Sequence, residues 1–288
     1  MSEEPKKTPE EIEFEKTRKY KHTLIDQLKN GVIIEAYQPE HARTAQKSGV
    51  KAIIAMEGLV KKLRDKYALT RMLDPSIFLK FIDVVALPVI GRVRTGHTAE
   101  AYVMESTGAD MIEESNNLAT ADENNFIDKK QFATPFMCTA HNLSTALARI
   151  HEGAVLIRAH LETSETEVHE LAQMVYTMRQ DIRKLQKMTD EEMEDFAESC
   201  EVPVELVKSV AEKGRLPVLY YASGCISTPA DVAFFMEFGC DGVVLNAHVF
   251  RSYDPEGRIS AMVQAVSSYK DDEKIAKLME DFEHEEKV

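Results

Sequence analysis

Residues 87–96 read LPVIGRVRTG, and this stretch decides how the rest of the chain is interpreted. Its first half is an apolar run typical of a buried strand, and its second half carries Arg92 and Arg94 at alternate positions. Side chains two residues apart on a strand project from the same face, so both cations are predicted to point the same way from the strand's carboxyl end. Ligands of parallel α/β proteins bind at that end. Arg92 is therefore a candidate ligand for an anionic substrate.

Apolar runs of strand length recur along the chain and alternate with amphipathic segments of helix length. The eight runs are residues 32–34, 52–55, 87–90, 110–112, 134–137, 154–157, 216–220 and 242–245. The helical segments are residues 39–47, 74–84, 98–107, 143–151, 165–186, 191–198, 203–212, 229–238 and 255–269. Proline behind a capping side chain marks two helix starts, at Asp74-Pro75 and Thr228-Pro229.

Strands that are apolar throughout and separated by helices predict a parallel sheet covered on both faces. Eight such units in 288 residues favour an α/β fold of the closed (β/α)8 type, a TIM barrel, over an open doubly wound sheet. No GxGxxG or GxxxxGK[ST] follows a strand, which argues further against the open nucleotide-binding sheet. Residues 162–213 predict about three extra helices between strands six and seven.

We expect three regions along the chain: a charged arm (1–21), the barrel (22–280) and a short acidic tail (281–288). The arm is interpreted as mobile, or as a helix that forms only against a neighbour. The formal net charge is −14, from 35 basic and 49 acidic residues, which argues against nucleic acid or an anionic membrane as a partner. No long apolar run and no secretory signal occurs, so the sequence predicts a cytoplasmic protein.

The four cysteines are dispersed, which favours buried reduced thiols over a metal or redox site; they are Cys138, Cys200, Cys225 and Cys240. We expect neither a metal nor a cofactor. Polar residues just past the predicted strands are the ones that would line the barrel mouth: Glu35, Glu57, Arg92, Arg94, Glu113, Glu114, Arg158, His160, Ser223, Gly224 and residues 246–248. Each alone is also compatible with a rim salt bridge or a helix cap. Together they suit a polar or phosphorylated ligand.

Residues 220–250 read YYASGCISTPADVAFFMEFGCDGVVLNAHVF, a pattern similar to the last two βα units of phosphate-binding barrels. In such units backbone amides at a helix start cradle the phosphate, and glycines allow close approach. Gly224 is followed here by Cys225, and Asn246-Ala247 follows strand eight. These positions therefore carry side chains where the close approach of the backbone to a phosphate favours glycine. The sequence is compatible both with a working phosphate site and with a degenerate one.

From about residue 24 to residue 276 the chain resembles the synthase subunit of glutamine-dependent pyridoxal 5′-phosphate synthase, the PdxS or SNZ family. The similar stretches are GVIIEAY, ARTAQKSGVKAIIAME, TRMLDP, LPVIGRVRTGHTAEA, ESTGADMIEES, RIHEGAVLIR, LPVLYYASGCISTPAD and FGCDGVVL. The resemblance implies a TIM barrel that assembles as two stacked hexameric rings and receives ammonia from a glutaminase subunit. Active members join a pentose phosphate, glyceraldehyde 3-phosphate and ammonia into pyridoxal 5′-phosphate.

The resemblance also implies two catalytic lysines, and this sequence replaces both. The family lysine of strand three, which holds the pentose as an imine, is Arg92, and the lysine after strand six is His160. Imine formation needs a primary amine that can lose its proton, which a guanidinium does not provide. An imidazole ring nitrogen cannot condense to a stable neutral imine.

Other family positions have changed as well. The glycine-rich phosphate loop after strand six is LETSETE at residues 161–167, with glutamates where an anion should sit. Glu35 and Glu113 stand for family aspartates, and Arg158 is an active-site arginine still in place. The substrate and phosphate positions are interpreted as a degenerate set: Gly153, Ser223, Gly224, Cys225, Asn246 and Ala247.

Three hypotheses follow from this pattern. The first is a pseudoenzyme subunit in a homo- or hetero-oligomer, a hexamer or dodecamer with an active synthase paralogue and with the glutaminase as a further candidate partner. The second is an active synthase subunit that uses a displaced lysine. The third is a barrel repurposed for another phosphorylated metabolite, with Glu35, Arg92, Arg158 and His160 as a new site and His160 as an acid/base group.

Overall fold

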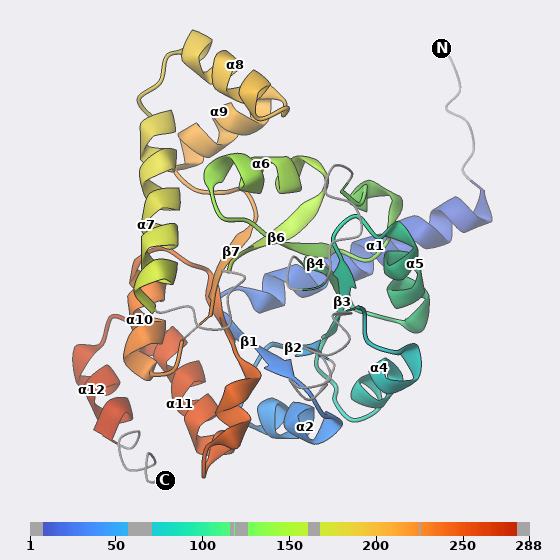
Figure 1. The fold of residues 1–288 in the computed structure, drawn as a ribbon, viewed down its shortest axis with the longest axis vertical. Coiled ribbons are helices and arrows are strands. Elements are labelled where there is room, and N and C mark those ends of the chain that lie inside the picture. The colour runs from blue at the N-terminus through green and yellow to red at the C-terminus, as the bar shows by residue number, and fades with distance from the viewer. Residues whose placement is uncertain are drawn as a thin grey trace, which may run out of the picture.

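Eight parallel strands close into a barrel in the computed structural model, which describes residues 8–56, 71–115, 118, 126–160, 168–224 and 226–280 (Figure 1). The strands are β1 (Gly31–Ala36), β2 (Ala52–Ala55), β3 (Val89–Arg94), β4 (Met111–Ser115), β5 (Phe136–Thr139), β6 (Ala154–Ala159), β7 (Leu219–Ser223) and β8 (Gly242–Leu245). Each strand pairs with the next, and β8 returns to β1 with Gly242 opposite Gly31. The predicted TIM barrel is confirmed.

Helices surround the strands and bury their apolar sides against the barrel's outer surface (Figure 1). They are α2 (Pro39–Lys47), α4 (Pro75–Ile82), α5 (Thr98–Thr107), α6 (Leu143–His151), α10 (Pro229–Glu237), α11 (Pro255–Ser268) and α12 (Asp272–Glu280). The two proline-marked starts are confirmed, because Asp74 caps α4 and Thr228 forms a capping box with Asp231 in α10. The α12 helix was not among the predicted elements.

Three helices fill the long connection between β6 and β7, as the sequence predicts. They are α7 (Val168–Leu185), α8 (Asp190–Ser199) and α9 (Val204–Lys213). In Figure 1 α8 and α9 lie together at one end of the molecule, away from the strands. None of the helices in the described part of the chain combines the length and the apolar character that a bilayer crossing requires.

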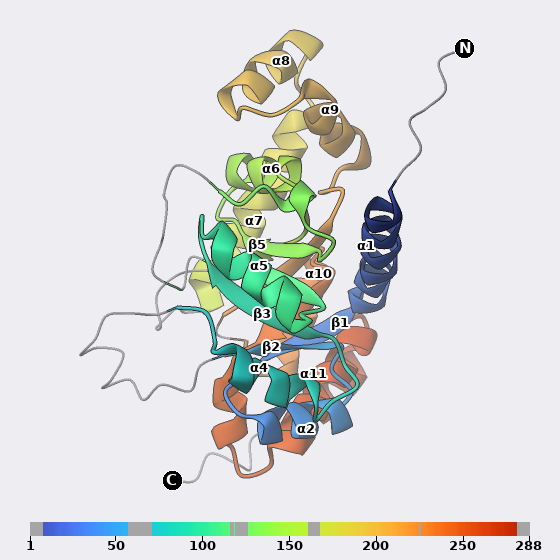
Figure 2. The ribbon, with the colours of Figure 1, turned by 90° about the vertical axis from the view of Figure 1, so that its right-hand side faces the viewer.

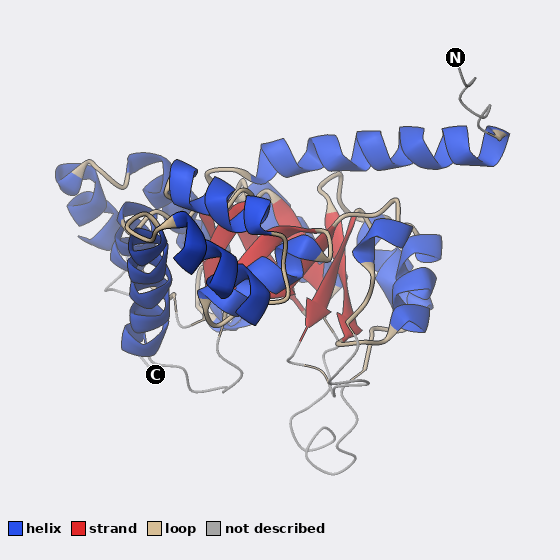
Figure 3. Cartoon of the chain, turned by 90° about the horizontal axis from the view of Figure 1, so that it is seen from above, coloured by secondary structure: helices blue, strands red, loops and turns tan. Residues whose placement is uncertain are grey.

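The first helix, α1 (Pro9–Leu28), lies across the face at which the strands begin, as Figures 2 and 3 show from two directions. Two contacts fix its second half there. The Lys21 ammonium donates to the carbonyl of Ala109 over 2.7 Å, and the Tyr221 hydroxyl donates to the carbonyl of Leu28. Residue 21 therefore lies inside a helix, while the division of the chain into arm, barrel and tail stays a prediction.

The barrel interior has two layers, because alternate side chains of each strand point inward. The layer nearest α1 is apolar and is built from Ile33, Ala52, Ile54, Ile90, Met111, Met137, Leu156, Leu219, Tyr221 and Val244, with Leu28 beneath them. The layer toward the carboxyl ends is charged. β3 reaches it because the strand continues through Arg94, beyond the apolar run at residues 87–90 from which it was predicted.

Gly242 makes room for the largest side chain of the apolar layer. A Cβ atom at this position would lie 2.4 Å from the ring of Tyr221 and 2.4 Å from the carbonyl oxygen of Gly31. Because neither neighbour can withdraw without disturbing the sheet, only glycine fits there.

Candidate functional site

Four charged side chains from four strands meet inside the barrel, toward the carboxyl ends. Glu35 comes from β1, Arg92 from β3, Glu113 from β4 and Arg158 from β6. Each occupies an inward position of its strand, two residues beyond an apolar side chain of the layer below. We call these four residues the ionic ring. The sequence predicted all four as mouth residues, and the structure brings them together.

The ionic ring is closed by four ion pairs. Arg92 donates from Nε to Oε2 of Glu113 over 2.6 Å and from Nη2 to Oε1 of Glu35 over 2.9 Å. Arg158 donates from Nη2 to the same oxygen of Glu35 and from Nη1 to Oε1 of Glu113, each over 2.6 Å. Two guanidinium groups thus alternate with two carboxylates, and their formal charges sum to zero.

Every nitrogen of the two guanidinium groups has a partner. The remaining Nη1 of Arg92 lies 3.5 Å from Sδ of Met56, and Nε of Arg158 donates to Oγ of Ser223 over 2.7 Å. No member of the ring is more than 4 % exposed. Buried ions of this kind are stable only when they are paired and hydrogen-bonded, and these are.

The ring holds its members in their charged forms. Burial alone would raise the pKa of Glu35, but attraction to Arg158 and Arg92 outweighs it and lowers that pKa to about 2. The pKa of Glu113 is lowered for the same reason, against burial, by Arg92 and Arg158. The pKa of Arg92 is raised further above its ordinary value, because its two carboxylate partners outweigh the effect of burial.

His160 lies just beyond β6, with Nδ1 3.4 Å from Oγ of Ser223. Burial, followed by repulsion from Arg158, lowers the pKa of His160 to about 3. The imidazole is therefore neutral at physiological pH and takes up a proton poorly. This argues against His160 as an acid/base group that works near neutral pH.

Arg94 and Glu114, two other predicted mouth residues, join separate clusters. Arg94 donates from Nε to Oε1 of Glu100 in the first turn of α5 over 2.8 Å. Glu114 points outward, and its Oε2 lies 2.6 Å from Nζ of Lys129, which is only 3 % exposed. A second carboxylate, Glu152, accepts from the same ammonium over 2.7 Å. Lys129 was not predicted as a site residue, because it lies in a connection and not beside a predicted strand end.

The remaining predicted positions are spread over the barrel. Gly224 has φ +149° directly after β7, and Asn246 caps the 3-10 turn η2 (Ala247–Arg251) by accepting from the backbone N–H of His248 over 3.0 Å. Gly153 lies in the turn ahead of β6, at the opposite end of that strand from the ionic ring. Glu57, Cys225 and the segment 161–167 lie outside the described residues. The role of the whole set in phosphate binding stays a prediction.

No group of three or more His, Cys, Asp or Glu side chains with the geometry of a metal site occurs within the described ranges. Cys138, Cys200 and Cys240 are buried free thiols, as the sequence predicts. Burial raises the pKa of Cys138 to about 12, so this thiol is unreactive.

A closed eight-stranded parallel barrel with a charged centre toward the carboxyl ends of its strands places the protein among the (β/α)8 barrels. A solved thiamine phosphate pyrophosphorylase from Pyrococcus furiosus shares the fold, with a TM-score of 0.50 and 13 % identity over 85 % of this chain and 98 % of that one. The SOR/SNZ family profile matches residues 17–223, and this chain belongs to that family. A shorter match, over residues 201–283, is to the thiazole biosynthesis protein ThiG.

Similar proteins include synthase subunits from distant organisms. The pyridoxal 5′-phosphate synthase subunit PdxS of Clostridium botulinum is 40 % identical over 93 % of this chain and 92 % of its own length. PdxS of Thermus thermophilus is 40 % identical over 92 % and 90 %. The probable pyridoxal 5′-phosphate synthase subunit of Dictyostelium discoideum is 39 % identical over 90 % and 85 %. The family resemblance seen in the sequence is confirmed.

Proposed function

We propose that this chain is a non-catalytic subunit of the pyridoxal 5′-phosphate synthase type, one that assembles with active synthase subunits and regulates them. The observation that carries the proposal is the ionic ring. Each guanidinium nitrogen of its two arginines already has a partner within the protein, and the formal charges of the ring sum to zero, so the ring offers a sugar phosphate little net attraction. The four side chains of the ring point into the barrel, and none of them carries a primary amine.

The chemistry of the ring supports the same conclusion. The carbon–nitrogen double bond of an imine forms only when an uncharged amine attacks the pentose carbonyl and water leaves. The two carboxylates stabilise the charged form of Arg92, and a guanidinium does not lose its proton in any ordinary pH range. His160, at the second lysine position of the family, is neutral but is not a primary amine.

Borohydride trapping tests the loss of catalysis directly. The protein is incubated with ribose 5-phosphate, reduced with borohydride and weighed by mass spectrometry. We expect no mass gain, whereas the Thermus thermophilus synthase subunit treated in parallel serves as the positive control. A pentose adduct located on any lysine of this chain would overturn the proposal.

Co-expression with an active family member tests the regulatory role. We expect one mixed oligomer, a hexamer or dodecamer, in which a tag on this chain retains the active subunit through gel filtration. Product formation per active subunit is expected to differ between the mixed and the homomeric assembly. Complete separation of the two chains would remove the role as a regulator.

An active synthase is the second candidate, because the chain is 40 % identical to synthase subunits and keeps Arg158 and two acidic residues at the centre. Such activity would require a displaced lysine. Residues 57–70, which lie outside the described ranges, contain three lysines in the sequence: Lys61, Lys62 and Lys66. The trapping experiment separates the two candidates, because an adduct on one of these lysines would favour the synthase.

Replacing Arg92 by lysine is expected not to restore synthesis. The substitution returns a primary amine to strand three, but His160 still provides none after strand six. The measurement is pyridoxal 5′-phosphate formation from ribose 5-phosphate, glyceraldehyde 3-phosphate and ammonia, with the double variant Arg92→Lys/His160→Lys alongside. Product from the Arg92→Lys variant alone would show that the second amine is not needed.

A further inference from the structure

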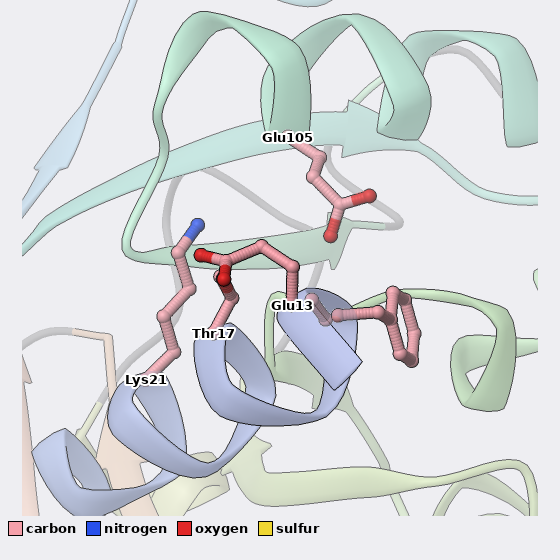
Figure 4. A pocket seen from close by; sticks show the side chains of 6 residues that line it. Glu13, Thr17, Lys21 and Glu105 are labelled. Atoms are coloured by element: carbon pink, nitrogen blue, oxygen red, sulfur yellow. The ribbon is translucent and has the colours of Figure 1, made fainter. Parts of the chain in front are cut away.

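A pocket of about 390 Å³ lies beneath α1 (Figure 4). It is on the side of the barrel where the strands begin, since its lining includes the end of α5 and the residue ahead of the β5 region. One face of α1 and two residues of the barrel body line it: Glu13, Phe14, Thr17 and Lys21, with Glu105 at the end of α5 and Ala133 ahead of β5. Its volume is comparable to that of small-molecule sites, and the pocket is open to solvent. Nothing in the function proposed above uses it.

The basic group of the pocket is already occupied. Nζ of Lys21 donates to the carbonyl of Ala109 over 2.7 Å and to Oγ1 of Thr134 over 2.8 Å, so two of its three N–H donors are spent. Burial lowers the pKa of Lys21, and the nearby carboxylates of Asp110 and Glu105 oppose that shift. Lys21 therefore serves as an anchor for α1, and it has little capacity left for an anionic ligand.

The two carboxylates of the pocket, Glu13 and Glu105, have more capacity to bind a ligand than Lys21 has. The Glu13 side chain is exposed, and Figure 4 shows it and the Glu105 carboxylate on either side of the pocket. Glu105 uses Oε1 to accept from the backbone N–H of Thr134 over 2.8 Å, which fixes the side chain, and no described residue donates a hydrogen bond to its Oε2. Two carboxylates against one ammonium give the lining a net negative charge.

We propose that this pocket binds a small organic cation, an ammonium or guanidinium group carried on a short apolar body. Glu13 and Oε2 of Glu105 accept hydrogen bonds from the cationic head, and such charge-assisted bonds are stronger than neutral ones. The ring of Phe14 and the methyl group of Ala133 cover the apolar body, and an aromatic face also attracts a cation. The site lies outside the ionic ring, so the inference holds whether or not the chain is catalytic.

Three probes of matched shape test the charge requirement on the full chain by isothermal titration calorimetry: 2-phenylethylammonium, 2-phenylethanol and 3-phenylpropanoate. We expect saturable binding of the ammonium and affinities at least about tenfold weaker for the alcohol and the carboxylate. Equal affinity for the ammonium and the alcohol would overturn the proposal, and so would the absence of saturable ammonium binding.

Two single substitutions on α1 locate the site. Glu13→Gln removes one carboxylate from the pocket, and we expect it to weaken 2-phenylethylammonium binding by at least about fivefold. Asp26→Asn removes one exposed carboxylate from the same helix, away from the pocket lining, and is expected to leave the affinity within about twofold. Equal weakening by both variants would indicate attraction by overall charge alone and would overturn the assignment to this pocket.

Discussion

Replacing Glu113 by glutamine is expected to lower the free energy of unfolding by about 3–5 kcal/mol. Glu113 is fully buried and bridges Arg92 and Arg158. The glutamine has nearly the same shape, so the substitution leaves no cavity but removes one negative charge. Two guanidinium groups would then share the single carboxylate of Glu35 in a buried interior, and an unpaired buried charge is among the largest single destabilising effects known.

Urea denaturation at neutral pH measures this loss. Glu237→Gln, which removes an exposed carboxylate at the end of α10, is the matched control and is expected to change stability by less than about 0.5 kcal/mol. Adding Arg92→Met to Glu113→Gln removes one charge of each sign, so we expect the double variant to be at least about 1 kcal/mol more stable than the sum of the single effects. A loss below about 1 kcal/mol for Glu113→Gln would mean that the ring is hydrated.

Acid is expected to unfold the protein through the two carboxylates of the ionic ring, Glu35 and Glu113. The pKa of Glu35 falls from 4.5 to about 2 on folding. A carboxylate with a lowered folded-state pKa binds fewer protons in the native state than in the unfolded state, so it stabilises the fold above pH 4.5 and loses that contribution as the pH falls toward 2. A shift of this size corresponds to a contribution on the order of 3 kcal/mol, and Glu113 adds to it in the same direction.

The pH dependence of the free energy of unfolding checks this prediction. We expect stability to be nearly constant between about pH 5 and 7 and to fall steeply below about pH 4.5. Glu35→Gln is expected to be less stable at pH 7 and to show a flatter decline in acid, because one of the two titrating groups is gone. An identical slope for the parent and Glu35→Gln would mean that other carboxylates control acid unfolding.

Much of the fold could be predicted from sequence because barrel strands and helices leave strong local patterns. The eight apolar runs, the proline-marked starts of α4 and α10 and the three helices after β6 were all recognised. Strand ends were less well predicted. β3 and β4 both continue past their apolar runs, because the charges of Arg92 and Glu113 find partners inside the barrel.

The members of the site could be predicted, but their arrangement could not. The predicted strand ends identified four mouth residues, Glu35, Arg92, Glu113 and Arg158. The local sequence does not indicate which of these residues form ion pairs with one another. Glu35 and Arg158 are 123 residues apart in the chain, so their contact depends on the closed strand order. The outward side chain of Glu114 and its buried partner Lys129 were missed for the same reason, since a lysine in a connection carries no pattern that marks burial.

The zero net charge of the ionic ring restricts the order in which such a barrel can diverge. An exchange of lysine for arginine at position 92 keeps the sign of the charge, so a lineage can accept it singly while the fold persists. An exchange at position 35 or 113 that removes a carboxylate passes through an intermediate with an unpaired buried cation, and selection for folding eliminates that intermediate. A change that keeps a cation at position 92 is thus expected to precede any change at the acidic positions that face it. Descendants of one ancestral barrel are expected to differ at the four ring positions either by changes that conserve charge or in compensating pairs.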